Sequence, residues 1–202
     1  MRRKAGAGGR PGAANQLRII GGEWRGRRLR FPDAAGLRPT ADRVRETLFN
    51  WLQGRVHGCR CLDLFAGSGA LGFEAASRGA AEVVMVEAAS RVAEALRNNA
   101  NLLGADAVRV EARRADAFLQ APAHPFDVVF LDPPFGKGLL ETALRGLAQG
   151  GWLNPDARLY IECEAELGEP ELPAGYAIVR RGRAGQVAYF LAARQAAANQ
   201  GE

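Results

Sequence analysis

The sequence predicts an α/β fold built on a doubly wound, mostly parallel sheet with an antiparallel last strand. From residue 58 to about residue 163, short apolar strands alternate with helical segments, the pattern of repeated βαβ units. The chain then ends in two strands separated by Arg181-Gly182-Arg183-Ala184-Gly185, which predicts an antiparallel hairpin at one edge. A length of 202 residues suits one such domain with a short extension.

The N-terminal part precedes this domain. Residues 1–16 are rich in Gly, Ala and Arg without apolar periodicity, so we expect a disordered basic tail. Alternating apolar residues and turn glycines over 17–31 predict a small β-hairpin, and a helix is expected over 41–52 with Thr40 as its N-cap. The chain thus divides into the tail (1–16), a hairpin-and-helix extension (17–52), the α/β domain (53–193) and a flexible C-terminal tail (194–202).

Strands and helices of the α/β domain follow from the same periodicities. Strands are expected over 59–64, 82–86, 107–112, 126–131, 157–163, 176–181 and 186–192. Helices are expected over 69–78, 90–103, 115–119 and 138–148, with Ser90 capping the second and Gly104 ending it. The nearly continuous apolar run over 126–131 is typical of a central strand buried on both faces.

Charge and composition narrow the class of protein. Residues 1–45 carry 12 Lys and Arg against 3 Asp and Glu, whereas the rest has a small negative balance. Such an arm favours nucleic-acid binding, and a merely solvated tail is the alternative. No apolar run is long enough to cross a membrane, and no signal peptide is evident, which predicts a cytoplasmic protein. Three cysteines indicate reduced thiols and argue against a disulfide framework or a four-ligand metal site.

A glycine-rich loop ends the first strand of the domain. Gly67, Gly69 and Gly72 match G-x-G-x-x-G, where small residues let a ligand approach the backbone at a helix start. Glu87, 20 residues beyond Gly67, ends the second strand and can accept hydrogen bonds from ribose hydroxyls. These features suit NAD and S-adenosylmethionine equally. The loop residues expected to line the ligand are Phe65, Ala66, Gly67, Ser68 and Gly69.

Asp63 favours S-adenosylmethionine. A carboxylate four residues before the first glycine would repel a pyrophosphate, whereas it can hold an ammonium group; the alternative is that it only caps the loop. After the third strand, Asp116 is placed to accept from the adenine amino group, with the Ala117 N–H nearby. The alternative for Asp116 is a helix N-cap.

The tetrapeptide Asp132-Pro133-Pro134-Phe135 follows the buried strand 126–131, at the sheet edge where such folds place their sites. An exocyclic base amine is a poor nucleophile because its lone pair is delocalised. Asp132 and the Pro133 carbonyl can accept its N–H groups, Pro134 helps to stiffen the turn, and Phe135 can stack on an extruded base. Asp132 can also take the proton as the amine becomes cationic. A rigid proline turn is the structural alternative.

Three further runs are specific enough to name a resemblance. They are Arg18-Ile19-Ile20-Gly21-Gly22, the segment from Arg38-Pro39-Thr40 to Leu52, and Asp63 through Gly79; with the Asp-Pro-Pro-Phe turn they span roughly residues 17–136. Together they resemble the bacterial RsmD-type ribosomal RNA guanine-N2 methyltransferase family. That resemblance implies a seven-stranded class I methyltransferase fold, S-adenosylmethionine as cofactor, and a guanine N2 target in 16S rRNA, within a partly assembled 30S subunit. We expect a monomer.

Basic side chains near these motifs are candidates for RNA contacts. The hairpin contributes Arg25 and Arg27, and Lys137 lies beside the proline turn. Arg38, Thr40, Arg43 and Arg45 surround the start of helix 41–52, where they can contact phosphates; salt bridges to Asp42 and Glu46 are the alternative.

Three other functions remain open from the sequence. Asp-Pro-Pro-Phe alone also permits methylation of DNA adenine or of a protein glutamine. The glycine fingerprint permits an NAD-dependent oxidoreductase, and the basic arm permits a non-catalytic RNA-binding module.

Overall fold

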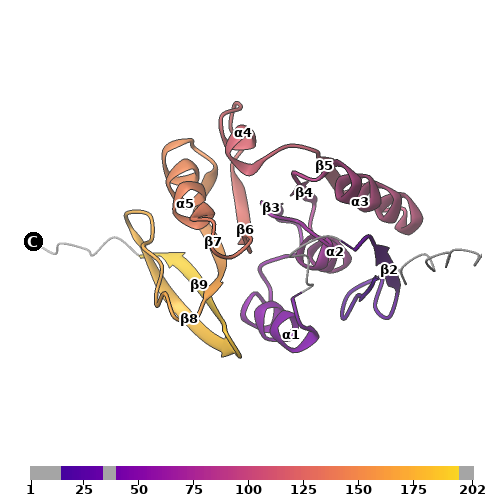
Figure 1. The fold of residues 1–202 in the computed structure, drawn as a ribbon, viewed down its shortest axis with the longest axis horizontal. Helices are drawn as coiled ribbons and strands as arrows, with labels where there is room; N and C mark the ends of the chain where they lie inside the picture. Colours follow the sequence, from indigo (N-terminus) through magenta and orange to yellow (C-terminus); the bar gives the residue numbers. More distant parts are fainter. Residues whose placement is uncertain (1–14, 34–39, 196–202) are drawn as a thin grey trace, which may run out of the picture.

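A computed structural model describes residues 15–33 and 40–195 (Figure 1). Arg38, a predicted RNA contact, lies outside these residues, as do residues 1–14 and 196–202 of the predicted tails. Each predicted tail extends too far into the folded part of the chain. Asn15 and Gln16 already belong to a strand, and Arg194 still does.

The central sheet has seven strands in the order β5-β4-β3-β6-β7-β9-β8. β3 to β7 run parallel, whereas β9 is antiparallel to both β7 and β8. The strands are β3 (Arg60–Asp63), β4 (Glu82–Val86), β5 (Val108–Glu111), β6 (Phe126–Leu131), β7 (Leu153–Glu164), β8 (Tyr176–Ala184) and β9 (Val187–Arg194). The predicted fold class is therefore confirmed.

Helices cover both faces of the sheet (Figure 1). The helices are α1 (Asp42–Trp51), α2 (Ala70–Ser77), α3 (Ser90–Leu103), α4 (Ala115–Leu119) and α5 (Leu139–Gln149). Successive residues of β6 alternate between two apolar cores: Val128 and Phe130 pack with α1, α2 and α3, whereas Val129 and Leu131 pack with α4 and α5. This burial on both faces explains the continuous apolar run.

A separate two-stranded hairpin, β1 (Asn15–Arg18) and β2 (Arg28–Phe31), packs on the α1–α2–α3 side. Leu17 pairs with Leu29, and both are buried in the same core as α1. The predicted hairpin is confirmed, and it is joined to the main domain by apolar burial rather than by strand pairing.

Two predicted caps are wrong. The residue that caps α1 is Ala41, and the Thr40 hydroxyl instead lies 3.4 Å from Asp132 Oδ2. Ala89 rather than Ser90 precedes α3, whereas Gly104 ends that helix in the left-handed conformation, as predicted. The Thr40 hydroxyl is drawn away because the chain enters α1 directly beside the end of β6.

The strand order reverses between β3 and β6, which are neighbours in the sheet but not in the sequence. In doubly wound folds, the carboxyl ends of the strands at such a switch point open onto the ligand site. Asp63 ends β3, Glu87 directly follows β4, and Asp132 directly follows β6. These three acids consequently lie at one edge of the sheet.

Candidate active site

The glycine loop is shaped by tight packing. Gly67 and Gly69 both have positive φ, where side chains are disfavoured. A Cβ at Gly69 would lie 2.6 Å from the Phe73 ring, and one at Gly72 would lie 2.5 Å from the Met85 side chain. The spacing that matches the dinucleotide fingerprint thus serves close helix–sheet packing here.

Asp63 is buried below this loop at 2% exposure, and its Oδ2 accepts the Gly72 N–H at 2.9 Å. Burial raises the pKa of Asp63 to about 7, and the nearby charges of Asp132 and Glu87 act in the same direction. The structure therefore bears out the loop-capping role of Asp63. Its contact with a ligand ammonium stays a prediction.

Glu87 closes the loop from β4. Its Oε2 accepts the Gly67 N–H at 3.0 Å, and its Oε1 accepts the Ala89 N–H at 2.7 Å. The side chain is only half-buried, so it can still meet a ligand from the open side. The ribose-binding role predicted for it remains a prediction.

Asp116 lies in the first turn of α4, but it is not the N-cap, which is Arg114. Asp116 is exposed, forms a two-bond ion pair with Arg114 at 3.0 and 2.9 Å, and accepts the Ala117 N–H. The hydrogen bond from Arg114 holds the pKa of Asp116 below its usual value. Adenine recognition by Asp116 and Ala117 is still a prediction, and the amino group would share an acceptor that Arg114 already uses.

The proline turn is rigid and open at once. Pro133 is buried, whereas Pro134 and Phe135 are exposed, the latter at 42%. Asp132, which lies between β6 and Pro133, is partly exposed. Burial of its carboxyl group raises its pKa to about 6, and a hydrogen bond from Thr40 acts in the opposite direction. The turn leaves an aromatic ring free beside a carboxylate.

Glu164 fixes the far end of this turn. It ends β7, and its Oε1 accepts the Gly136 N–H at 2.6 Å, where Gly136 has positive φ. Sequence reasoning missed Glu164, because only the pairing of β6 with β7 brings it beside the turn.

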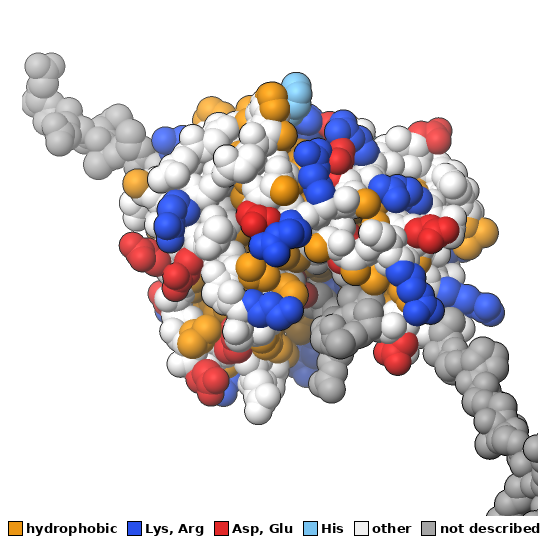
Figure 2. Space-filling model, turned by 45° about the horizontal axis from the view of Figure 1, so that its top comes forward, with side chains coloured by type: hydrophobic (Ala, Val, Ile, Leu, Met, Phe, Trp, Pro, Cys, Tyr) orange, Lys and Arg blue, Asp and Glu red, His pale blue; other side chains and the backbone are white. Residues whose placement is uncertain are grey.

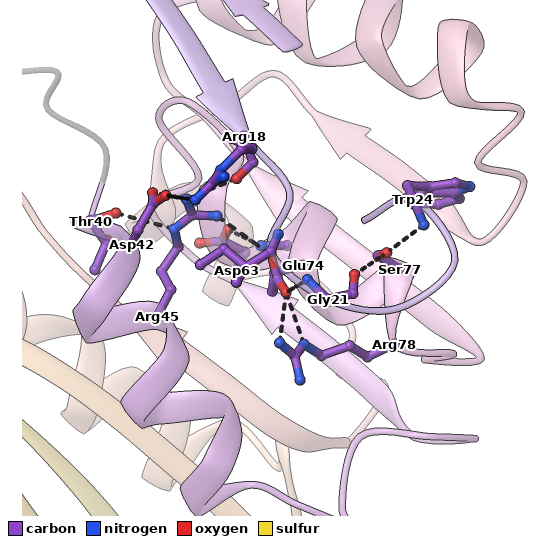
Figure 3. Close-up of polar contacts among 12 residues, drawn as sticks. Arg18, Gly21, Trp24, Thr40, Asp42, Arg45, Asp63, Glu74, Ser77 and Arg78 are labelled. Atoms are coloured by element: carbon purple, nitrogen blue, oxygen red, sulfur yellow. Dashed lines mark hydrogen bonds and ion pairs between the residues drawn. The ribbon is translucent and has the colours of Figure 1, made fainter. Parts of the chain in front are cut away.

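The extension is fastened to α2 by a buried carboxylate. Glu74, fully buried, accepts the Ile20 N–H at 2.9 Å, the Gly21 N–H at 2.7 Å and a bond from Arg78 at 2.9 Å. Arg45 reaches it from α1 at 3.5 Å, as Figure 3 shows. Sequence reasoning missed Glu74, which appears there as one acid in a helix otherwise made of apolar and small residues.

The RNA-binding role predicted for Arg45 is wrong. Its side chain is 1% exposed and donates to the carbonyls of Thr40 at 3.2 Å and Arg18 at 2.9 Å, and to Asp42 at 2.6 Å (Figure 3). A buried guanidinium with these partners cannot reach a phosphate. Of the two salt bridges considered from the sequence, the one to Asp42 forms. Arg45 instead holds the chain at Thr40, the residue that contacts Asp132.

The other predicted RNA contacts within the described residues are accessible. Arg25, Arg27, Arg43 and Lys137 are exposed, and Thr40 is half-buried. On the face shown in Figure 2, Lys and Arg side chains are interspersed with acidic and apolar ones and do not merge into one patch. Their RNA contacts stay predictions.

All three cysteines are free thiols, as the sequence predicts. Among the described residues, no helix has both the length and the apolar character needed to traverse a lipid bilayer.

A seven-stranded sheet with a reversed last strand, and a glycine loop at its switch point, define the class I methyltransferase fold. The chain belongs to the family described as "Conserved hypothetical protein 95", which it matches over residues 17–193. The resemblance to the RsmD type is thereby confirmed, since the relatives below carry that name.

Two relatives and one solved structure illustrate the family. The chain is 50% identical over 183 residues to "Ribosomal RNA small subunit methyltransferase D" of Escherichia coli K12, covering 91% of this chain and 92% of the relative. It is 44% identical to the protein of that name from Haemophilus influenzae, covering 90% and 95%. The structure of "Putative methyltransferase yhhF from Escherichia coli" superposes with a TM-score of 0.85 at 48% identity, covering 90% and 99%.

Proposed function

We propose that this protein transfers a methyl group from S-adenosylmethionine to the N2 amine of a guanine in small-subunit ribosomal RNA. The observation that carries the proposal is the Asp132–Phe135 turn, which presents a carboxylate and a free aromatic ring beside the glycine loop. The names of the relatives support ribosomal RNA as the substrate. We further propose that a monomer acts in the cytoplasm on an assembling 30S subunit.

The residues at the sheet edge fit the proposed cofactor. Gly67 and Gly69, both with positive φ, leave these two loop positions without side chains, and the half-buried Glu87 provides acceptors suited to two ribose hydroxyls. Asp63 below the loop is an acid without a cationic partner among the described residues, which suits a ligand that carries an ammonium. When bound, S-adenosylmethionine supplies a methyl group activated by a positively charged sulfur.

The turn acts mainly by positioning. Asp132 and the Pro133 carbonyl accept the two N–H groups of the amine, which directs its lone pair out of the base plane. Phe135 stacks on the base once it leaves the RNA helix, and the prolines keep the carbonyl fixed. Orienting both reactants in this way is worth several kcal/mol.

Asp132 also receives the proton. When the amine lone pair forms the new bond to the methyl carbon, the bond from that carbon to the cofactor sulfur would break with its electron pair left on the sulfur. The nitrogen becomes cationic, and one N–H bond then breaks toward Asp132 Oδ. A carboxyl with a pKa of about 6 is ionised at neutral pH, yet basic enough to accept that proton.

Exposed basic side chains bring the RNA to this edge. Arg25 and Arg27 on the hairpin, Arg43 on α1 and Lys137 after the turn can each contact a phosphate. The N-terminal arm adds further charge that acts over a Debye length.

Mass spectrometry of ribosomal RNA nucleosides tests the proposal. Cells that lack the protein should lose one N2-methylguanosine from the small-subunit RNA, and restoring the gene should return it. In parallel, the purified protein is incubated with labelled cofactor and with separate RNA, DNA and protein fractions. Label entering only DNA or protein would overturn the proposal in favour of an amine methyltransferase of another substrate.

A further inference from the structure

A buried acid next to the proposed site has no role in the steps above. Glu162 lies on β7 at 5% exposure, and none of the ion pairs among the described residues involves it. A buried carboxylate without a cation is costly unless it is protonated or supplied with hydrogen-bond donors. Its neighbours therefore decide its protonation state.

Those neighbours form a chain that ends at the proposed catalytic carboxylate. The Tyr160 hydroxyl donates to Glu162 Oε1 at 2.8 Å. The Thr40 hydroxyl lies 3.4 Å from Asp132 Oδ2, and a hydrogen bond from the same hydroxyl lowers the pKa of Glu162, which places Thr40 beside that carboxyl group as well. Thr40 thus stands between the two acids.

Counting protons fixes the direction of the chain. A hydroxyl has one hydrogen and can donate it to only one of two carboxylates. When Thr40 donates to Asp132, its contact with Glu162 is attractive only if Glu162 carries a proton and donates to the Thr40 oxygen. Burial raises the pKa of Glu162 to about 8, and the charge of Asp132 acts in the same direction, which agrees with a neutral Glu162 at pH 7.

We propose that neutral Glu162 is a positioning residue for methyl transfer, acting through the Thr40 hydroxyl to keep Asp132 ionised and oriented toward the amine. The inference rests on the proposed function. Two donors of the chain are shown by geometry, since the Tyr160 hydroxyl donates to Glu162 and the Thr40 hydroxyl donates to Asp132. With the Glu162 proton directed at the Thr40 oxygen, the chain stabilises negative charge on Asp132.

Ionisation of Glu162 makes the rate of methyl transfer depend on pH. Once Glu162 ionises, Thr40 lies between two carboxylates. Glu162 then competes with Asp132 for the single hydrogen of the Thr40 hydroxyl. The groups that face Glu162 are Tyr160 on β7, Asp132 after β6, Asp63 on β3 and Tyr189 on β9, so no cation among the described residues offsets the new charge. The rate should therefore fall on the alkaline side, with a midpoint at about pH 8 or below, because a cationic cofactor favours ionised carboxylates.

The test is the pH dependence of methyl transfer to 30S particles from cells that lack the protein, measured from pH 6 to pH 9 at saturating cofactor. Wild type should lose rate on the alkaline side with a midpoint at about pH 8 or below. E162Q keeps a donor for Thr40 and cannot ionise, so its alkaline fall should vanish and its rate at pH 7 should stay well above that of E162A. We expect E162A to lose about tenfold, as for one lost hydrogen bond in the chain that orients Asp132.

Two variants keep the test independent of folding. Y160F removes a donor that favours ionised Glu162, so the alkaline midpoint should move to higher pH. E166Q alters an exposed acid on the same segment and should reproduce the wild-type profile. An unchanged alkaline fall in E162Q, or a midpoint unmoved in Y160F, would overturn the inference even if wild type methylates guanine N2. Wild type without N2 methylation would instead overturn the proposed function.

Discussion

The buried Glu74 and a group of three acids at the sheet edge lie within the same α/β domain, and they differ in what surrounds them. Glu74 on α2 is met by two guanidinium groups and two backbone N–H groups. The group formed by Asp63, Asp132 and Glu162 is met by hydroxyls and backbone N–H groups, and the charge of Asp132 raises the pKa of both other members. Glu74 joins the extension to α2, whereas the group of three lies at the sheet edge where we place the chemistry.

The difference separates structural from functional acids. A buried carboxylate whose lone pairs are satisfied by cations holds two elements together. Acids that have raised pKa values and no cationic partner can bind a cationic ligand or exchange a proton with it. Such acids are common in active sites. If so, removing Glu74 should cost stability, and removing an acid from the group of three should cost activity.

The largest expected effect is on Asp132. D132A should lose about 10³-fold in methyl transfer, because the amine loses both its acceptor and its base, while cofactor binding in calorimetry stays close to wild type. D132N keeps an oxygen acceptor and should lose less. Equal loss of cofactor binding and transfer in D132A would assign Asp132 a structural role.

Next in size is Glu74. E74Q should lower the free energy of unfolding by about 3 kcal/mol, because it leaves the buried Arg45 without one of its carboxylates. Urea denaturation measures the change. The matched control E82Q breaks the partly exposed pair with Arg60 and should cost less than about 1 kcal/mol. A similar small loss in both variants would contradict the structural role of Glu74.

The smallest effect is the pH dependence that Asp63 imposes on stability. The pKa of Asp63 is raised to about 7 in the folded protein, so between its ordinary value and 7 the folded state binds more protons than the unfolded state. Stability from this group is thus present at low pH and lost as the pH rises to 7. D63N keeps an acceptor for the Gly72 N–H and does not ionise.

Comparing the unfolding free energies of wild type and D63N at pH 5 and pH 8 isolates this contribution. D63N should gain on wild type by about 2–3 kcal/mol over that interval, at about 1.4 kcal/mol for each pH unit below the folded pKa. Acids away from Asp63 titrate alike in both proteins and cancel, whereas the charge of Asp63 also raises the pKa of Glu162, so both variants are compared in an E162Q background. A constant difference between the two pH values would show that Asp63 has an ordinary pKa.

Much of the sheet edge could be predicted from local pattern. The glycine loop, Asp63, Glu87 and the proline turn each follow a strand directly, and parallel strands bring their carboxyl ends to one edge. Helix caps were less predictable, because Thr40 has an alternative partner in Asp132 that is 92 residues away in the sequence.

By itself, the sequence determined the α/β class, the order of the elements and the edge where the acids gather, because strand and helix periods and turn residues are local properties. Only the tertiary structure decided that Arg45 is buried against Glu74, and that Glu162 and Glu164 of β7 lie behind the proline turn. Those contacts depend on which strands become neighbours and how deeply each side chain is covered. The burial of an acid and the groups around it, rather than its residue type, then decide whether the acid joins two elements or takes part in proton transfer.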